Sequence, residues 1–250
     1  MRRLAAALAV LALTFGSAKA AEESRPAKQH WSFDGLFGTF DRAALQRGFQ
    51  VYKEVCSACH PMTYLAYRNL AEIGFDEENI RAIAASVEVQ DGPNDLGEMF
   101  TRPGRPSDSF AKPYANDKAA RAVNNGALPP DLSKIVSARP GGPDYLFAIL
   151  TGYGEPPAEV KLLEGMNYNA VFPGHQIAMP PPLNEGSVTF QDGTPATVAE
   201  EARDVTTFLT WASEPILEQR KQLGWKVMLY LLILTGMLYA TKRKVWADIH

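Results

Sequence analysis

Cysteine is scarce in this sequence: Cys56 and Cys59 are the only two among 250 residues. Any disulfide would have to join these two, so a disulfide-dense scaffold is excluded. A zinc site is normally built from four Cys or His ligands. The chain has only four histidines and no second CxxC pair, so it offers few ligands for such a site. With 46% hydrophobic residues, the chain is long enough to bury one sizeable core, and it shows no internal repeat.

Long hydrophobic runs are also few, and the first lies at the N-terminus. Two arginines precede an apolar run from Leu4 to Phe15, and the small residues Ala18 and Ala20 follow. That order is typical of a cleaved secretory signal peptide, here residues 1–20. A first membrane helix is the alternative, but about twelve apolar residues are short for a bilayer that needs roughly 20.

The second run lies near the C-terminus and contains one charged residue, Lys226, between Leu223 and Ala240. It is long enough to cross a bilayer. Three basic residues, 242–244, follow it directly and should stay in the cytoplasm. A buried core helix is the alternative, but little chain follows that could cover it. The sequence therefore predicts a periplasmic domain (21–221), a transmembrane helix (222–241) and a cytoplasmic tail (242–250).

Charge is unevenly divided among these parts. Seven of the 25 basic residues and one of the 28 acidic residues lie in the signal peptide, in the second apolar run or after it. The predicted periplasmic domain is left with 18 basic and 27 acidic residues, a net charge of −9. Such a domain repels nucleic acid and attracts basic partners.

Both cysteines belong to one short motif, Cys56-Ser-Ala-Cys59-His60. A thioredoxin-like redox pair would open a helix, whereas the helical pattern at about 41–56 places this motif at a helix end. C-x-x-C-H is the attachment pattern of c-type haem, because two thiols at this spacing reach both vinyl groups of one porphyrin and the next imidazole reaches the iron. The motif therefore predicts covalent haem c, with His60 as the proximal ligand.

A haem iron that transfers electrons needs a second axial ligand, whereas an open site binds small molecules. Met179 is favoured, since it stands in FPGHQIAMPPPLNEG between a Pro-Gly pair and three prolines. A rigid backbone lowers the entropy cost of making a weak thioether bond. His175, in the same loop, is the next candidate. The remaining exported candidates are His30, Met62, Met99 and Met166.

Helical spacing and N-cap residues predict five helices before the membrane segment, at about 41–56, 76–86, 117–124, 143–150 and 197–212. Thr197 and Glu200 form a capping box at the start of the last one. SVTFQDGT, with its Asp192-Gly193 turn, is the one good hairpin signal. The predicted fold is mostly α, a cytochrome c-like haem domain with long loop insertions plus one C-terminal transmembrane helix.

Six segments, in order, resemble the cytochrome c1 family, the haem c subunit of the cytochrome bc1 complex (quinol:cytochrome c oxidoreductase). They are GFQVYKEVCSACHPMTYLAYRNL, EVQDGPNDLGEMFTRPG, ARAVNNGALPPDLSKIV, GGPDYLFAILTGY, FPGHQIAMPPPLNEG and FLTWASEPILEQRK. The resemblance covers essentially all of the mature chain and is more specific than CxxCH with a distal methionine. It implies thioether links at Cys56 and Cys59, and axial ligation by His60 and Met179.

The resemblance also implies a haem pocket. In similar proteins the NNGALPP segment lines the haem, and Arg139 matches an arginine whose planar guanidinium pairs with a propionate carboxylate. Three further positions match residues that pack against the ring. The implied pocket residues are Asn124, Ala127, Pro129, Pro130, Arg139, Tyr145, Phe172 and Ile177.

The function implied by the resemblance is single-electron transfer within quinol–cytochrome c reductase, respiratory or photosynthetic, with no bond-making chemistry of this subunit's own. The implied protein partners are cytochrome b, a Rieske iron-sulfur protein as electron donor and a periplasmic or membrane-bound c-type cytochrome as electron acceptor. The implied complex is dimeric, lies in the bacterial inner membrane and couples quinol oxidation to proton translocation. The acidic stretch of Glu88, Asp91, Asp95 and Glu98 is a candidate docking face for a basic cytochrome, and a merely solvated loop is the alternative.

Two other functions remain open. A membrane-anchored monohaem cytochrome that feeds an oxidase outside a bc1 complex would share the haem motif and the membrane segment. A haem sensor with an open sixth site would share CxxCH, but it has no reason to share the six ordered segments.

Overall fold

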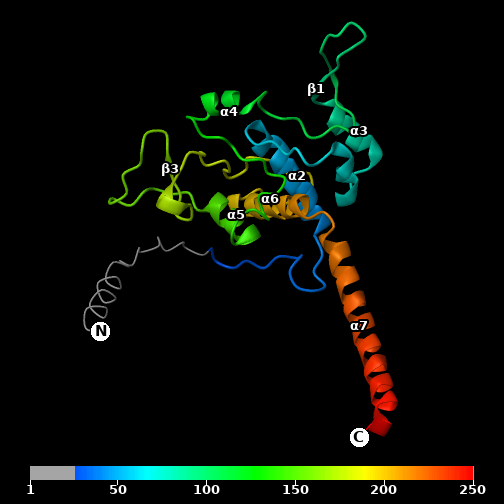
Figure 1. The fold of residues 1–250 in the computed structure, drawn as a ribbon. Coiled ribbons are helices and arrows are strands. Elements are labelled where there is room, and N and C mark those ends of the chain that lie inside the picture. Colours follow the sequence, from blue (N-terminus) through cyan, green and yellow to red (C-terminus); the bar gives the residue numbers. More distant parts are fainter. Residues whose placement is uncertain (1–25, 250) are drawn as a thin grey trace, which may run out of the picture.

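The computed structural model describes residues 26–249, so the predicted signal peptide lies outside the described residues. Figure 1 shows a head of short helices and long loops, from which one long helix extends. Helices dominate the regular structure, and the two sheets have only two short strands each. The predicted mostly α fold with long loops and one long C-terminal helix is confirmed.

All five helices predicted in the head are present, with ends within two residues of the expected positions. In chain order the helices and strands are α2 (Arg42–Glu54), η1 (Cys56–Ala58), η2 (Tyr67–Ile73), α3 (Glu77–Ala85), β1 (Glu88–Asp91), β2 (Phe100–Pro103), α4 (Asp117–Val123), α5 (Gly142–Thr151), β3 (Asn167–Tyr168), η3 (Pro173–His175), β4 (Gln176–Ile177), α6 (Val198–Ser213), α7 (Leu217–Val245) and η4 (Ala247–Ile249). The strands pair antiparallel, β1 with β2 and β3 with β4.

The core of the head is built around the contact between α2 and α6, which cross at the centre of Figure 1. The α2 helix begins at Asp41, whose carboxylate accepts hydrogen bonds from two backbone N–H groups of the first turn. Phe208 on α6 packs against Phe49 and Tyr52 on α2, with ring centroids 5.7 and 5.8 Å apart. Burial of these large rings is a major source of stability for the crossing.

Gly48 sets how closely the two helices approach. A Cβ at this position would lie 2.0 Å from the backbone oxygen of Asp204 and 2.8 Å from Cβ of Phe208. Both distances are far inside van der Waals contact, so only glycine allows the two backbones to meet here.

An ion pair next to Gly48 also joins the two helices. Arg47 donates from Nε and Nη2 to the carboxylate of Asp204, at 2.6 and 3.1 Å, and from Nη1 to Asp192 at 2.9 Å. Burial raises the pKa of Asp204 to about 6, although the Arg47 guanidinium acts in the opposite direction. Because the desolvation cost of a buried ion pair offsets much of its attraction, we interpret the pair as fixing the register of α2 on α6.

The hairpin predicted at SVTFQDGT is wrong. Val188 and Phe190 are buried, as an alternating strand would require, but no second strand follows them. The chain turns at Asp192, whose side chain accepts the N–H of Thr194 at 3.0 Å. The N-cap of α6, Thr197, comes so soon afterwards that there is no length for a returning strand.

The predicted capping box of α6 is only half formed. Thr197 accepts the backbone N–H of Glu200 at 3.2 Å, as expected. The Glu200 carboxylate lies 3.5 Å from the Arg47 guanidinium instead of bonding back to the N-cap backbone. A full positive charge competes here with a single N–H dipole, and the charge is the stronger attraction.

The α7 helix is long and apolar enough to cross a membrane, and none of its apolar segment is buried against the head. It begins five residues before the predicted span of 222–241 and continues through the basic residues 242–244. At its start, Glu218 accepts the backbone N–H of Phe40 and pairs with Arg42, both at 2.7 Å. These bonds attach the helix directly to the head.

We expect Gly48→Ala to destabilise the head by about 3 kcal/mol, because the added methyl group must push α2 away from α6. Chemical unfolding followed by far-UV circular dichroism measures this loss. Gly154→Ala is the matched control: an added Cβ there meets nothing within 4 Å, and we expect a change below about 1 kcal/mol. Equal stability of the two variants would contradict the close crossing.

Candidate haem site

The CxxCH motif forms a tight turn directly after α2. The backbone N–H groups of Cys59 and His60 both donate to the carbonyl of Cys56, at 3.1 and 2.9 Å. The motif is thus wound around one carbonyl, with both thiols free and half-buried. Helix α2 therefore presents two thiols and an imidazole from a single turn.

The Cys56 thiol is poorly suited to exchange chemistry. Burial, with a smaller contribution from Cys59, raises the pKa of the Cys56 thiol to about 12. Reactive redox cysteines need the opposite shift, since the thiolate is the nucleophile. This disfavours the thioredoxin-like interpretation on a second, independent ground.

The His60 ring is oriented by a backbone carbonyl from a distant segment. Its Nδ1 lies 2.9 Å from the carbonyl oxygen of Pro130. A carbonyl can only accept, so Nδ1 carries the proton and Nε2 keeps its lone pair. Burial also lowers the pKa of His60, which favours the neutral ring. A neutral imidazole with one nitrogen hydrogen-bonded and the other free is the usual form of a metal-binding histidine.

Asp131 holds the Pro130 carbonyl in place. Its carboxylate accepts hydrogen bonds from the hydroxyl and the backbone N–H of Thr63, at 2.6 and 3.1 Å, and from the N–H of Ser133 at 2.8 Å. Segment 129–133 is therefore tied to the residues that follow His60. Sequence reasoning missed Asp131, although its place directly after the Pro-Pro pair was a signal that could have been followed.

Met179 follows β4 in a loop that is held from two sides. Its carbonyl accepts hydrogen bonds from the Tyr153 hydroxyl at 3.1 Å and from Asn167 Nδ2 at 3.4 Å. The side chain is half-buried. The predicted rigidity of this backbone thus has a hydrogen-bonded basis in addition to the three prolines.

The turn between β3 and η3, which leads into the Met179 segment, is fixed by Asn169, which sequence reasoning did not single out. Asn169 is fully buried and donates from Nδ2 to the carbonyl of Ile149 on α5, at 2.8 Å. Its Oδ1 accepts the N–H groups of Val171 and Phe172, at 3.0 and 3.1 Å. Nothing in the local sequence marks this asparagine, because its partners are distant or are backbone groups.

His175 has a different environment from Met179. It is exposed and adopts a left-handed backbone conformation with φ of 57°. Its backbone closes the turn before β4 by donating to the carbonyl of Phe172 at 2.8 Å. This geometry favours Met179 over His175 as the distal ligand. Met62 is fully buried in the hydrophobic core, and Met99 is 56% exposed in the β1–β2 connection.

The residues predicted to line the haem are only partly brought together by direct contacts. Pro130 meets His60, as described above. Asn124, the C-cap of α4, donates to the carbonyl of Ala120 and the hydroxyl of Tyr114, at 2.7 and 3.1 Å. Tyr145 is half-buried on α5. The others are half-buried or buried and have no polar contact with the motif in the described part of the chain: Ala127, Pro129, Phe172 and Ile177.

Arg139 lies in the exposed segment before α5. Across residues 26–249, its guanidinium makes no ion pair and no hydrogen bond with the protein. Its side chain is therefore available to a carboxylate that the protein does not itself supply.

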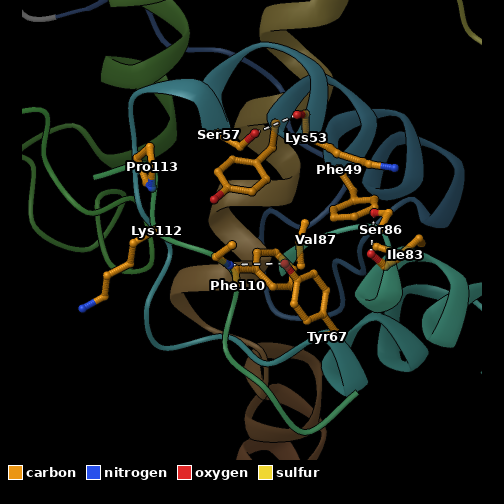
Figure 2. A pocket seen from close by; sticks show the side chains of 12 residues that line it. Phe49, Lys53, Ser57, Tyr67, Ile83, Ser86, Val87, Phe110, Lys112 and Pro113 are labelled. Carbon is orange, nitrogen blue, oxygen red and sulfur yellow. Dashed lines mark hydrogen bonds between the residues drawn. The ribbon is translucent and has the colours of Figure 1, made fainter. Parts of the chain in front are cut away.

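A cavity of about 160 Å³ lies beside the motif, at the end of α2 (Figure 2). Ser57, which separates the two cysteines, lines it together with Lys53, and Phe49, Tyr67 and Phe110 supply aromatic walls. None of the residues predicted to contact the haem lines this cavity. Its volume is also below the roughly 300 Å³ at the lower end of small-molecule sites. The cavity is therefore separate from the candidate haem site.

The predicted acidic docking face lies on the β1–β2 hairpin, which projects from the head at the end opposite α7 (Figure 1). Asp91 is not free there, because Arg102 bonds to its carboxylate and lowers its pKa. Glu88, Asp95 and Glu98 are exposed. The acidic face thus consists of three of the four expected residues.

Comparison with known proteins supports one family. The Cytochrome C1 family model matches residues 31–249. Cytochrome c1 of Rhodospirillum rubrum is 49% identical over 99% of this chain and 97% of its own length. "Cytochrome c1 1, heme protein, mitochondrial" of Arabidopsis thaliana is 48% identical over 94% of this chain and 76% of its own length.

A protein named "Cytochrome b/c1" from Bradyrhizobium diazoefficiens is 50% identical over 98% of this chain, which spans only 39% of that relative's length. The match to the family model and the two relatives above cover nearly the whole chain, from before the CxxCH motif to the end of α7. The chain therefore belongs to the cytochrome c1 family.

Proposed function

We propose that the protein is the haem c subunit of a bc1 complex and relays single electrons from a Rieske iron-sulfur protein to a c-type cytochrome. The observation that carries the proposal is the His60 ring, held by the Pro130 carbonyl so that Nε2 is free, beside two thiols on the same turn. Membership of the cytochrome c1 family supports the same function, as do relatives named as heme proteins.

The donor set suits one covalently bound haem c, which supplies one-electron iron chemistry when it is attached at Cys56 and Cys59. His60 provides the proximal nitrogen, and the Pro130 carbonyl fixes the ring plane and increases the basicity of Nε2. Met179 provides the distal thioether. A methionine thioether together with a histidine imidazole would favour the reduced iron and raise the reduction potential, which would suit a carrier late in an electron-transfer chain.

Four further side chains have positioning roles in this proposal. Tyr153 and Asn167 hold the Met179 carbonyl, and Asn169 holds the turn between β3 and η3 that leads into this segment, so little freedom is lost when the thioether binds. Arg139, which has no protein partner in the described part of the chain, pairs with a propionate carboxylate. The remaining pocket residues contribute apolar or backbone contacts to the ring.

The proposed topology places residues 21–221 in the periplasm, 222–241 in the bacterial inner membrane and 242–250 in the cytoplasm, after a signal peptide of residues 1–20. The unburied apolar surface of α7 supports the membrane span, and the basic residues that follow it support the orientation. Cytochrome b, a Rieske protein and an acceptor cytochrome are the proposed partners, in a dimeric complex. A relative named "Cytochrome b/c1" supports association with cytochrome b.

Purification of the tagged full-length chain from its membrane in mild detergent tests the proposed complex. We expect a cytochrome b and a Rieske protein to elute with it in constant proportion. A chain that elutes as a haem protein without either partner would support the oxidase-linked alternative and contradict the bc1 proposal.

We expect Met179→Ala to abolish the low-spin, high-potential spectrum of the attached haem, because the distal ligand is lost. Optical spectra and a redox titration measure this, and readier binding of carbon monoxide to the reduced protein is expected as well. His175→Ala is the control from the same loop and should leave spectrum and potential unchanged. The reverse pattern would make His175 the ligand.

Replacement of Asp95 and Glu98 by Asn and Gln should slow electron transfer to a basic cytochrome at low salt, by roughly threefold to tenfold, because long-range attraction is reduced. The dependence of the rate on ionic strength should become weaker as well. Asp117→Asn on α4, an exposed acid outside the hairpin, is the control. If all three proteins respond alike to salt, the hairpin is not the docking face.

A further inference from the structure

We infer that the turn of residues 35–38, here called the GLFG loop, inserts Leu36 and Phe37 into the periplasmic leaflet of the membrane beside α7. The inference rests on the proposed function only in that α7 spans the bilayer. It adds a second lipid contact, made by the head itself, to the transmembrane helix.

The GLFG loop exposes two consecutive large apolar side chains. Leu36 is 56% exposed and Phe37 is 76% exposed. Scattered apolar residues are common on protein surfaces, but an adjacent pair held out at the tip of a turn marks an interaction site. Phe33 and Phe40, on either side of the loop, are instead buried, and their ring centroids lie 5.1 Å apart.

The backbone of the loop is built to hold this conformation. Gly35 has φ of 69°, a left-handed conformation that strains other residues. A Cβ at Gly38 would lie 1.9 Å from the backbone oxygen of Asp34. The turn is closed by a hydrogen bond of 3.1 Å from the N–H of Thr39 to the carbonyl of Ser32. The apolar pair is thus displayed by a tight turn anchored in the core.

The position of the loop follows from its bonds to the start of α7. The Lys221 ammonium donates to the carbonyl of Phe33 and, at 3.4 Å, to that of Gly38. Lys221 lies two residues before Leu223, where the apolar run begins, which is about 3 Å along the helix axis. Figure 1 shows this N-terminal segment next to the start of α7. The loop therefore lies at the level where α7 enters the membrane.

The side chains at this end of α7 suit a layer of lipid headgroups above acyl chains. The Asp34 carboxylate, directly before the loop, accepts the backbone N–H of Trp31 at 3.2 Å. In the described part of the chain Lys221 bonds only to carbonyls and has no carboxylate partner. In a bilayer, the Lys221 ammonium would pair with a lipid phosphate, and the exposed apolar side chains beside it would contact the acyl chains. Ile216, at the same end of α7, is 58% exposed. Leu96, at the other end of the head, is equally apolar but lies between the acidic residues of the β1–β2 hairpin.

Spin labelling tests the inference on the whole complex in lipid nanodiscs. Once haem is attached both native cysteines of this chain are occupied, so Phe37→Cys gives the subunit one free thiol for the label. The complex without the substitution, labelled in the same way, gives the background signal of the other subunits. Power saturation then compares access of oxygen, which partitions into lipid, with access of a water-soluble nickel chelate. We expect the oxygen-to-nickel ratio at residue 37 to be severalfold higher than at Leu96→Cys, an exposed leucine far from α7.

Two further variants keep the outcomes distinct. Leu36→Cys should report lipid as Phe37→Cys does, and Tyr230→Cys, on the exposed surface of α7, reports whether that helix is in the bilayer. If residue 230 reports lipid while residues 36 and 37 report water, the inference is wrong and the proposed function stands. Labels at 36 and 37 that are immobilised and shielded from both reagents would place a protein partner there and also overturn it. Water at residue 230 would overturn the proposed membrane span as well.

Discussion

The close crossing of α2 and α6 positions the CxxCH turn and the start of α7 relative to each other. Gly48 lets the two backbones touch, and Phe49, Tyr52 and Phe208 fill the space around the contact. Helix α2 ends at the CxxCH turn, while α6 is followed within a few residues by α7. The crossing therefore determines where the thiols and His60 stand relative to the membrane helix, and a shift of α2 along α6 would move the whole site.

Loops packed around the α2–α6 crossing complete the candidate haem site. Hydrogen bonds between side chains and the backbone hold these loops in place. Pro130 offers a carbonyl to His60, and Asp131 ties that segment to the chain beyond the motif. Tyr153 holds the carbonyl of Met179, and Asn169 holds the turn that leads into the Met179 segment. Few of these loops have regular structure, so individual polar side chains replace the hydrogen bonds that a sheet would otherwise provide. Side chains also form hydrogen bonds to the backbone at the start of α7, where Lys221 and Glu218 bind the N-terminal segment.

Local patterns predicted the helices well and the strands poorly. Four of the five helices of the head begin with a capping side chain, and α5 begins with a proline in its first turn. Each start is therefore specified by residues close together in the chain. The β1–β2 strands are largely polar and exposed and gave no alternating pattern. The expected hairpin at Asp192 had the pattern but no room for a second strand. Glu200 left its capping box because Arg47, distant in sequence, attracts it more strongly.

Covalent haem attachment and a helix fit for a membrane could both be predicted from the sequence, since both depend on residues that are neighbours in the chain. The family followed in the same way from ordered segments. Only the tertiary structure decided which nitrogen of His60 is free, how the Met179 loop is held, and that the GLFG loop stands beside the start of α7. Those features join residues tens to more than a hundred positions apart, and such contacts exist only once packing has brought the segments together.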